Sequence, residues 1–283
     1  MRVVSLLPAA TEIVAALGAG SLLVGVSHEC DYPPEVRGLP RVTRSRLDAT
    51  RSSGEIDRAV AHAKQSGVSP VELDIDLVAR LRPDVIIAQS VCAVCAVGEG
   101  ELERLVDSLM PTPWVVTLHT HRLDGVLDDM RRLGGALELP DEAEEVVAGL
   151  RYRLRRVRET RAPHPTPPRV LVLEWLDPPY VAGHWVPELV EVAGGVAVAG
   201  AVGEASRTHA WRDLVALEPD LVVIALCGFD VPRARVEFAA ITDGDARALF
   251  RRRCEFLDGH AYTSRPGPRL VDAAEMLAEW LRG

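Results

Sequence analysis

The sequence predicts an α/β fold in which two lobes, each with a parallel sheet, are joined by one long helix. Short apolar runs rich in β-branched residues alternate with amphipathic helical patterns, as in α/β proteins. A helix-to-strand pattern also occurs twice, once in each half of the chain. Between the halves lies a helical pattern of unusual length, at 141–160. We therefore expect lobes at 1–138 and 169–283, with a connecting helix and its proline-rich exit at 139–168.

The repeated pattern is a helix that leads into a buried strand. Residues 78–88 align without a gap on residues 214–224, and each copy contains Leu-x-Pro-Asp just before the strand. The two strands show no polar face, which is typical of strands in parallel sheets that are covered on both sides. Cys227 then falls at the position next to that of Cys92. The repeat therefore predicts that both lobes place thiols in equivalent loops.

The first lobe begins with a strand that passes directly into a helix. Pro8 starts this helix, and Gly18 and Gly20 end it. The Pro and Asp content of 27–34 predicts a loop after the second strand. We expect strands at 2–7, 22–26, 85–88 and 114–118, and helices at 8–17, 56–64, 73–81, 99–109 and 123–137.

The second lobe repeats this order after the connecting helix. The proline-rich segment 162–168 favours a stiff, extended exit from that helix. Residues 174–179 are predicted to form a loop, because three of the six are Asp or Pro. We expect strands at 169–173, 221–224 and 254–257, and helices at 187–194, 214–217, 233–240, 246–252 and 269–281.

Composition and charge exclude several classes of function. The chain has 283 residues, enough for two domains with cores of their own. Its net charge of −9 argues against a nucleic-acid partner or an anionic membrane surface. No apolar stretch approaches the length of a membrane-spanning helix, and a strand follows Met1 without a signal-peptide pattern. We therefore expect no membrane insertion and a cytoplasmic protein, with a periplasmic or other extracytoplasmic location as the alternative if the start of the sequence has been trimmed.

The five cysteines do not follow the pattern of a small secreted disulfide framework. Cys92 and Cys95 form a C-x-x-C motif after a predicted strand, at the sheet edge where ligands bind in open α/β sheets. Cys30 and Cys227 also follow predicted strands. Four thiolates suit a tetrahedral zinc ion or an iron-sulfur cluster. The alternative is that each cysteine is a small buried apolar residue, and we expect this for Cys254, which lies inside a strand pattern.

The densest cluster of polar and aromatic residues lies in the second lobe. Its indoles are suited to stack on a ligand while its carboxylates orient that ligand, as in many small-molecule sites. The alternative is that the two tryptophans pack the loop onto its own lobe. The cluster consists of Glu174, Trp175, Asp177, His184 and Trp185.

Two other loops add candidate binding groups. His28 is the best candidate among the loop histidines, because it shares its loop with Glu29 and Cys30. Before the last helix, Arg265 and Arg269 together with the helix N-terminus would suit an anionic group such as a carboxylate or phosphate. The alternative is a helix cap with surface arginines.

Several of these features resemble a known family. Residues 5–12 (SLLPAATE), 25–27 (GVS) and 31–33 (DYP), the two Leu-x-Pro-Asp segments and the long central helix are similar to the iron-siderophore and vitamin B12 binding proteins of ABC importers. The resemblance covers nearly the whole chain. It implies two Rossmann-like lobes joined by one rigid backbone helix, a metal chelate held in the cleft between the lobes, and an ABC permease as partner.

The same resemblance shows where this chain departs from the family. Cobalamin-binding relatives line the cleft with aromatic residues where this chain has Glu29, Gln89 and Ser206. Relatives also carry two acidic residues that dock onto arginines of the permease. Asp76 matches the first of these residues, and Arg212 occupies the position of the second.

The sequence therefore predicts a non-enzymatic binding protein whose ligand is cobalamin, another corrinoid or a related metal chelate. The alternative hypothesis is a cytoplasmic metalloprotein, redox-active or enzymatic, with a zinc ion or an iron-sulfur cluster held by Cys30, Cys92, Cys95 and Cys227. The predicted ligand-binding residues are Pro8, His28, Glu29, Gln89, Glu174, Trp175, Asp177, His184, Trp185, Phe229, Tyr262 and Arg265.

Overall fold

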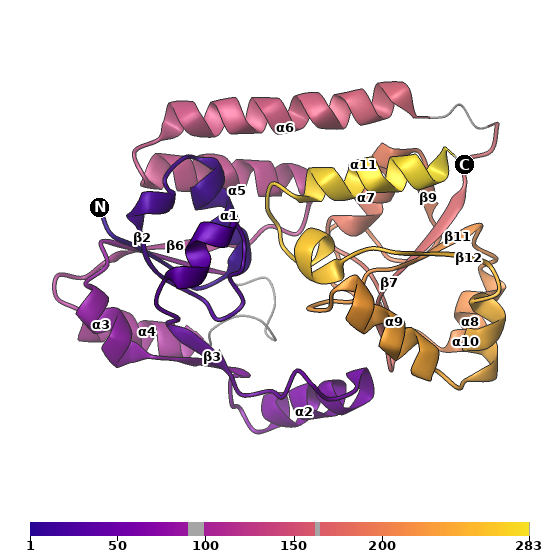
Figure 1. Cartoon of the computed structure of the whole chain (residues 1–283), viewed down its shortest axis with the longest axis horizontal. Coiled ribbons are helices and arrows are strands. Elements are labelled where there is room, and N and C mark those ends of the chain that lie inside the picture. The colour runs from indigo at the N-terminus through magenta and orange to yellow at the C-terminus, as the bar shows by residue number, and fades with distance from the viewer. Residues whose placement is uncertain (90–98, 162–164, 283) are drawn as a thin grey trace. The chain divides into compact units, whose positions relative to one another are not determined.

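The computed structural model describes residues 1–89, 99–161 and 165–282, which form two compact units (Figure 1). Two short segments from the first half of the chain belong to the second unit. The N-terminal unit comprises Met1–Arg51, Arg58–Thr120 and Val126–Ala148. The C-terminal unit comprises Ser52–Asp57, His121–Gly125 and Gly149–Gly283.

A four-stranded parallel sheet forms the centre of the N-terminal unit, in the order β2-β1-β5-β6. The four strands predicted for this half of the chain are confirmed. They are β1 (Val3–Ser5), β2 (Leu23–Val26), β5 (Val85–Gln89) and β6 (Trp114–Leu118). The helices that accompany them are α1 (Pro8–Ala16), α3 (Ile75–Leu81), α4 (Glu99–Ser108) and α5 (Leu123–Ala136).

The N-terminal unit also contains an antiparallel strand pair that the sequence analysis did not predict. The pair consists of β3 (Thr43–Ser45) and β4 (Val71–Leu73), and α2 (Ser53–Gln65) lies between them in the chain. Each strand has three residues, which is too short for a two-residue alternation to stand out.

The Asp74 carboxylate accepts a hydrogen bond from the Leu77 N–H at 2.8 Å, so it caps α3 and the helix starts later than predicted.

A six-stranded mixed sheet forms the centre of the C-terminal unit, in the order β10-β8-β7-β11-β12, with β9 also paired to β7. The parallel strands are β7 (Arg169–Leu176), β9 (Val196–Ala197), β11 (Leu221–Ile224) and β12 (Arg253–Phe256). The antiparallel strands are β8 (Pro179–Val181) and β10 (Arg207–Thr208).

The segment 174–179, predicted to be a loop, is instead the end of β7 and a tight turn into β8. Across this hairpin Trp175 pairs with Tyr180, and Leu176 pairs with Pro179. The Asp and Pro content led to the wrong prediction, whereas the aromatic residues suit a half-buried strand. Pro179 is tolerated because it is the first residue of β8.

The long helix predicted at 141–160 is confirmed as α6 (Pro140–Thr160). In the C-terminal unit, the guanidinium of Arg153 on α6 donates hydrogen bonds to Asp272 at 2.5 Å and to Glu275 at 2.6 and 2.9 Å. Both carboxylates belong to the last helix. The remaining helices are α7 (Val186–Ala193), α8 (Trp211–Ala216), α9 (Val231–Ala240), α10 (Gly244–Leu249) and α11 (Leu270–Leu281).

Each unit has an apolar core of its own. Val4 and Ile86 are fully buried in the N-terminal unit, and Leu171 and Val222 are fully buried in the C-terminal unit. Ile56, from the first turn of α2, packs against the C-terminal core. Within the described part of the chain, the helices lack the combination of length and apolar character that crossing a bilayer requires.

The repeated Leu-x-Pro-Asp segment ends a helix and starts a strand in both units. Arg82 follows α3 with a φ angle of 44°, and Glu218 lies just after α8 with a φ angle of 47°. These left-handed conformations stop a helix. Pro83 and Pro219 come next, and they have no N–H group with which to continue the helical hydrogen bonds.

The aspartate of the same segment then binds the neighbouring strand. Asp84 Oδ2 accepts a hydrogen bond from the Arg2 N–H at 2.6 Å, and Asp220 Oδ2 accepts one from the Arg169 N–H at 2.8 Å. Each aspartate N–H donates to the carbonyl oxygen of the same arginine at 2.8 Å. Each arginine side chain donates to the leucine carbonyl of its Leu-x-Pro-Asp segment at 2.7 Å. These contacts set the register of β5 beside β1 and of β11 beside β7.

We predict that the Asp220→Ala change lowers the free energy of unfolding by about 1–2 kcal/mol, because it removes a charged acceptor from a backbone N–H. The Asp220→Asn variant keeps an acceptor oxygen and should lose less. Urea unfolding followed by far-UV circular dichroism measures both values. Wild-type stability in the alanine variant, or equal losses in the two variants, would contradict this role.

Candidate functional site

Several predicted ligand-binding residues lie at one edge of the N-terminal sheet. Pro8 follows β1, His28 and Glu29 follow β2, and Gln89 is the last residue of β5. Because these strands are parallel, their carboxyl ends share the edge of the sheet where ligands usually bind. Pro8, His28 and Gln89 are half-buried, and Glu29 is exposed. The N-terminal unit therefore presents polar groups at this edge.

His28 is fixed by a residue of β3. Its N–H donates to Thr43 Oγ1 at 2.9 Å, and its Nδ1 lies 2.7 Å from the same oxygen. Its Nε2 lies 3.5 Å from Glu29 Oε1. Burial lowers the pKa of His28 below its ordinary value, and Arg41 acts in the same direction, although Glu29 opposes both. The imidazole is therefore neutral at pH 7. Thr43 was missed by the sequence analysis because β3 was not predicted.

Cys30 shares this loop but is fully buried. Its Sγ lies 3.1 Å from Thr11 Oγ1 on α1, and its carbonyl oxygen accepts a hydrogen bond from Arg41 at 2.5 Å. The structure thus packs this predicted metal ligand within the N-terminal unit. Cys92 and Cys95 lie outside the described residues.

Cys227, the fourth predicted metal ligand, is half-buried after β11. Its N–H donates to the carbonyl oxygen of Glu174 on β7 at 2.9 Å. Glu174 is half-buried, and Asp177, in the turn after β7, is exposed. Within residues 1–89, 99–161 and 165–282, no three or more His, Cys, Asp or Glu side chains gather in a way that could hold a metal ion. The four-cysteine centre includes two residues outside these ranges and stays a prediction.

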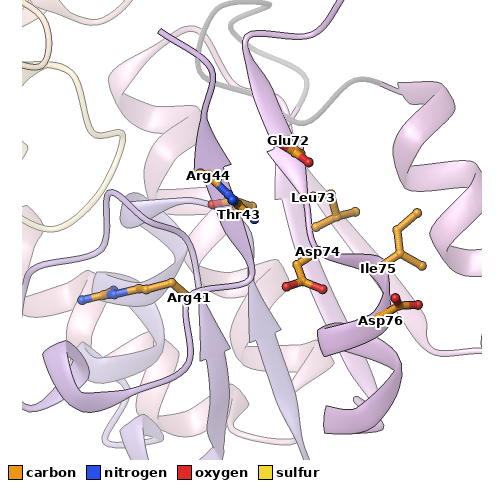
Figure 2. A pocket seen from close by; sticks show the side chains of 8 residues that line it. All are labelled: Arg41, Thr43, Arg44, Glu72, Leu73, Asp74, Ile75 and Asp76. Atoms are coloured by element: carbon orange, nitrogen blue, oxygen red, sulfur yellow. The ribbon is translucent and has the colours of Figure 1, made fainter. Parts of the chain in front are cut away.

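A polar pocket of about 370 Å³ opens in the N-terminal unit beside β3 and β4 (Figure 2). Asp74 caps α3, whereas Asp76 is exposed on the first turn of that helix. The pocket was not predicted from the sequence, because the antiparallel pair of β3 and β4 that forms one side of it was not predicted. The lining residues are Arg41, Thr43 and Arg44 from β3 and its approach, and Glu72, Leu73, Asp74, Ile75 and Asp76 from β4 and the start of α3.

In the C-terminal unit, Trp175 and Phe229 form an aromatic contact at the carboxyl ends of β7 and β11. Their ring centroids are 5.1 Å apart, and the Arg233 guanidinium lies 5.1 Å from the Phe229 centroid. The indole N–H of Trp175 donates to the carbonyl oxygens of Ser53 and Asp177, both at 3.2 Å. Phe229 is buried, but Trp175 is only half-buried and keeps accessible ring surface.

A buried glutamate that the sequence analysis missed holds the first turn of α2 in this unit. The Ser53 N–H donates to Glu237 Oε2 at 2.9 Å, and Glu237 Oε1 pairs with Arg233 at 2.8 Å. The hydroxyl of Tyr180 lies 3.4 Å from Oδ1 of Asp57, which comes after the first turn of α2. Arg233 and Glu237 are four residues apart on a predicted helix, and this spacing could have indicated that they form an ion pair. The same spacing is common in ion pairs on the solvent-exposed face of a helix, so it does not indicate a buried glutamate.

His184 and Trp185 follow β8 and contact two other loops. The Nδ1 atoms of His184 and His121 are 3.1 Å apart, and the His184 ring centroid lies 5.4 Å from that of Trp185. Burial lowers the pKa of His184, and His121 adds to this effect. Trp185 is buried, and its indole N–H donates to the carbonyl oxygen of Thr263 at 2.9 Å. Trp185 therefore packs within its own unit, while His184 is half-buried.

Tyr262 and Arg265 follow β12. Tyr262 is half-buried, and the Arg269 guanidinium lies 5.5 Å from the centroid of its ring. Arg265 is 4% exposed and contacts the imidazole of His260. The alternative of surface arginines at this helix start is therefore wrong for Arg265. A buried guanidinium beside a histidine ring is chemically suited to an anionic group.

Comparison with known proteins identifies relatives over nearly the whole chain. The family model described as Periplasmic binding protein matches residues 3–230. The chain is 24% identical over 289 residues to the vitamin B12-binding protein of Vibrio cholerae serotype O1, an alignment that covers 99% of this chain and 89% of that protein.

Solved structures of binding proteins share the fold. The apo form of the periplasmic heme-binding protein RhuT from Roseiflexus sp. RS-1 superposes with a TM-score of 0.73 and 23% identity, covering 99% of this chain and 97% of that one. The periplasmic vitamin B12 binding protein BtuF of Vibrio cholerae has a TM-score of 0.71 and 23% identity, with 99% and 96% covered. The α/β fold expected from the resemblance is therefore confirmed.

Cys254 gives a prediction that depends on its pKa. Its thiol is half-buried in β12, and burial, together with the charge of Glu255, raises its pKa to about 11. Because the thiolate is the reactive form, only about a thousandth of this thiol is ionised at pH 8. We expect iodoacetamide to modify Cys254 at least about 50-fold more slowly in the native protein than in urea. Peptide mass spectrometry measures both rates, and equal rates would contradict the raised pKa of the Cys254 thiol.

Proposed function

The chain belongs to the periplasmic binding protein family, and from this premise we propose that it binds a corrinoid or a related metal chelate such as heme. The names of relatives and solved neighbours include vitamin B12-binding and heme-binding proteins. Vitamin B12 and heme are named as ligands of those proteins, not of this chain. Both ligands belong to one chemical class, because each is a metal-bearing macrocycle with polar groups at its rim. This class is the basis of the proposal.

One observation within each unit supports the proposal. In the N-terminal unit, His28 and Gln89 occupy the carboxyl ends of parallel strands. In the C-terminal unit, Glu174, Trp175 and Phe229 lie at the carboxyl ends of β7 and β11. This edge is where open α/β sheets bind their ligands. Each unit therefore offers a set of polar or aromatic groups at its binding edge.

The composition of these edges indicates how the ligand would be held. Where cobalamin-binding relatives are expected to have aromatic residues, this chain has the polar Glu29 and Gln89 in the N-terminal unit. Trp175 supplies a half-buried ring in the C-terminal unit, and Arg265 supplies a buried positive charge. We infer that hydrogen bonds and charge from polar residues contribute more to affinity than flat stacking from both sides.

The comparisons favour a binding protein over the alternative metalloprotein. The names of the relatives describe ligand binding, and none supports a cysteine-bound zinc ion or iron-sulfur cluster. Solved neighbours are named as periplasmic proteins, which favours an extracytoplasmic location over the cytoplasmic one expected from the sequence. In this proposal residues 1–138 and 169–283 act as the two lobes, and 139–168 connects them.

An ABC permease is the partner that this function requires. Asp76 is exposed on the first turn of α3 and lines the 370 Å³ pocket (Figure 2). Its carboxylate is accessible to an arginine of a docking protein, which is the role that the family resemblance implies. The same pocket is lined by Glu72 and Asp74 and by two arginines, Arg41 and Arg44, so both signs of charge are present there.

The ligand proposal is tested by titration with cyanocobalamin and with hemin, followed by absorption and by tryptophan fluorescence. We expect saturable binding of one of them, and we expect the Trp175→Ala change to weaken it about tenfold or more through the lost ring contact. Trp114→Ala is the matched control, because Trp114 is 58% exposed and lies on an edge strand of the other unit. Equal affinities in wild type and both variants would exclude Trp175 from the site.

The partner proposal is tested in vesicles that carry the cognate permease. We expect Asp76→Asn to reduce ligand uptake about tenfold, the effect of losing one charge of a desolvated pair, while ligand affinity in solution stays unchanged. Glu145→Gln, which removes an exposed carboxylate on α6, is the control. Wild-type uptake with Asp76→Asn would argue against docking through this residue.

A further inference from the structure

Two histidines of the C-terminal unit form a close pair, of which only His184 is among the ligand-binding residues predicted from the sequence. His121 lies between β6 and α5, and His184 lies between β8 and α7. Their Nδ1 atoms are 3.1 Å apart, and their rings are within 19° of parallel with centroids 5.1 Å apart. We propose that this pair is a binding site for a divalent transition-metal ion of the Ni²⁺ or Zn²⁺ type.

The distance between the nitrogens fits this role. Imidazole nitrogens bind such metals at about 2.0–2.1 Å, so two nitrogens at neighbouring coordination positions lie about 3 Å apart. The 3.1 Å separation of the two Nδ1 atoms meets this requirement without movement of the backbone. In the metal complex both rings bind through the Nδ1 lone pair, so the ring that donated its Nδ1 proton in the hydrogen bond carries that proton on Nε2 instead. The metal therefore replaces the hydrogen bond between the rings, and no proton is lost.

The backbone of His184 is held in an uncommon conformation. Its φ angle is 52°, in the left-handed region that non-glycine residues rarely adopt. Its N–H donates to the carbonyl oxygen of Glu204 at 2.7 Å, and its own carbonyl oxygen accepts from the Gly203 N–H at 2.8 Å. Gly183 is required beside it, because a Cβ there would lie 2.3 Å from the Glu204 oxygen. Surrounding contacts therefore maintain a strained residue, a feature that is concentrated at functional sites.

The loop of His121 is fixed by a carboxylate of α7. Glu188 Oε2 accepts a hydrogen bond from the Leu123 N–H at 2.8 Å, and Glu188 Oε1 lies 3.3 Å from the Arg122 guanidinium. The charge of Arg122 next to the pair is thereby offset, which lowers its repulsion of a cation. On the other side, the Trp185 ring lies 5.4 Å from that of His184 and shields it.

The surroundings also indicate what kind of metal complex would bind. His121 is exposed and His184 is half-buried, so a hydrated ion can reach both. Within the described ranges, no third His, Cys, Asp or Glu completes a metal-binding group with them. The other coordination positions are then left for water or for donor atoms of a small chelator. Such a site favours borderline metals that bind imidazole well.

The test uses the untagged protein in a Cys92→Ser, Cys95→Ser background, which removes competing thiolates. Isothermal titration calorimetry with Ni²⁺ should show one binding site per chain. His121→Gln and His184→Asn should each weaken it about tenfold or more. Asn is chosen at position 184 because it tolerates a positive φ angle. His62→Gln, at an exposed position on α2, is the matched control and should bind as the parent does.

A second readout guards against misfolding of the His184 variant. In a ¹⁵N-labelled sample, substoichiometric Ni²⁺ should broaden the imidazole resonances of His121 and His184 before those of the other histidines. Absence of Ni²⁺ binding by the parent, equal loss of binding in His62→Gln, or broadening centred on other histidines would each overturn the proposal. None of these outcomes bears on corrinoid or heme binding, which is measured separately.

Discussion

Both units depend on one junction, the Leu-x-Pro-Asp segment, where a helix ends and a central strand begins. The residue before each proline takes a left-handed conformation, the proline ends the helical hydrogen bonds, and the aspartate binds the backbone of the neighbouring strand. The arginines at positions 2 and 169 complete the same contact in the two units. Since β5 and β11 lie between other strands of their sheets, the register of each sheet depends on this junction.

Because the central strands are parallel and in register, the candidate binding residues lie together at their carboxyl ends. The loops there are positioned by bonds between side chains and backbone. Thr43 fixes His28, and Arg41 fixes the carbonyl oxygen of Cys30. In the C-terminal unit Glu237 fixes the first turn of α2. A binding function follows naturally from such edges, because rigid strands support polar loops whose side chains remain accessible.

Local patterns in the sequence predicted the central strands and most of the helices well. Uninterrupted apolar runs after Pro-Asp predicted β5 and β11, because parallel strands that are buried on both faces consist almost entirely of apolar residues. Short or tertiary features were not predictable in this way. The three-residue strands β3 and β4 carry too little pattern, and the prolines of 174–179 concealed a hairpin. For the candidate site, the loops were found from strand ends, but the partners Thr43 and Glu237 come from elements distant in sequence. The approach of His121 to His184 likewise depends on tertiary structure.

We propose that this chain binds one metal-bearing macrocycle. Native mass spectrometry of the wild-type protein, incubated in turn with cyanocobalamin, hemin and a ferric siderophore, is the decisive experiment. We expect a single ligand adduct per chain for a corrinoid or heme, and we expect it to survive dilution to micromolar concentration. Folded protein that forms no adduct with any of these chelates would refute the proposal.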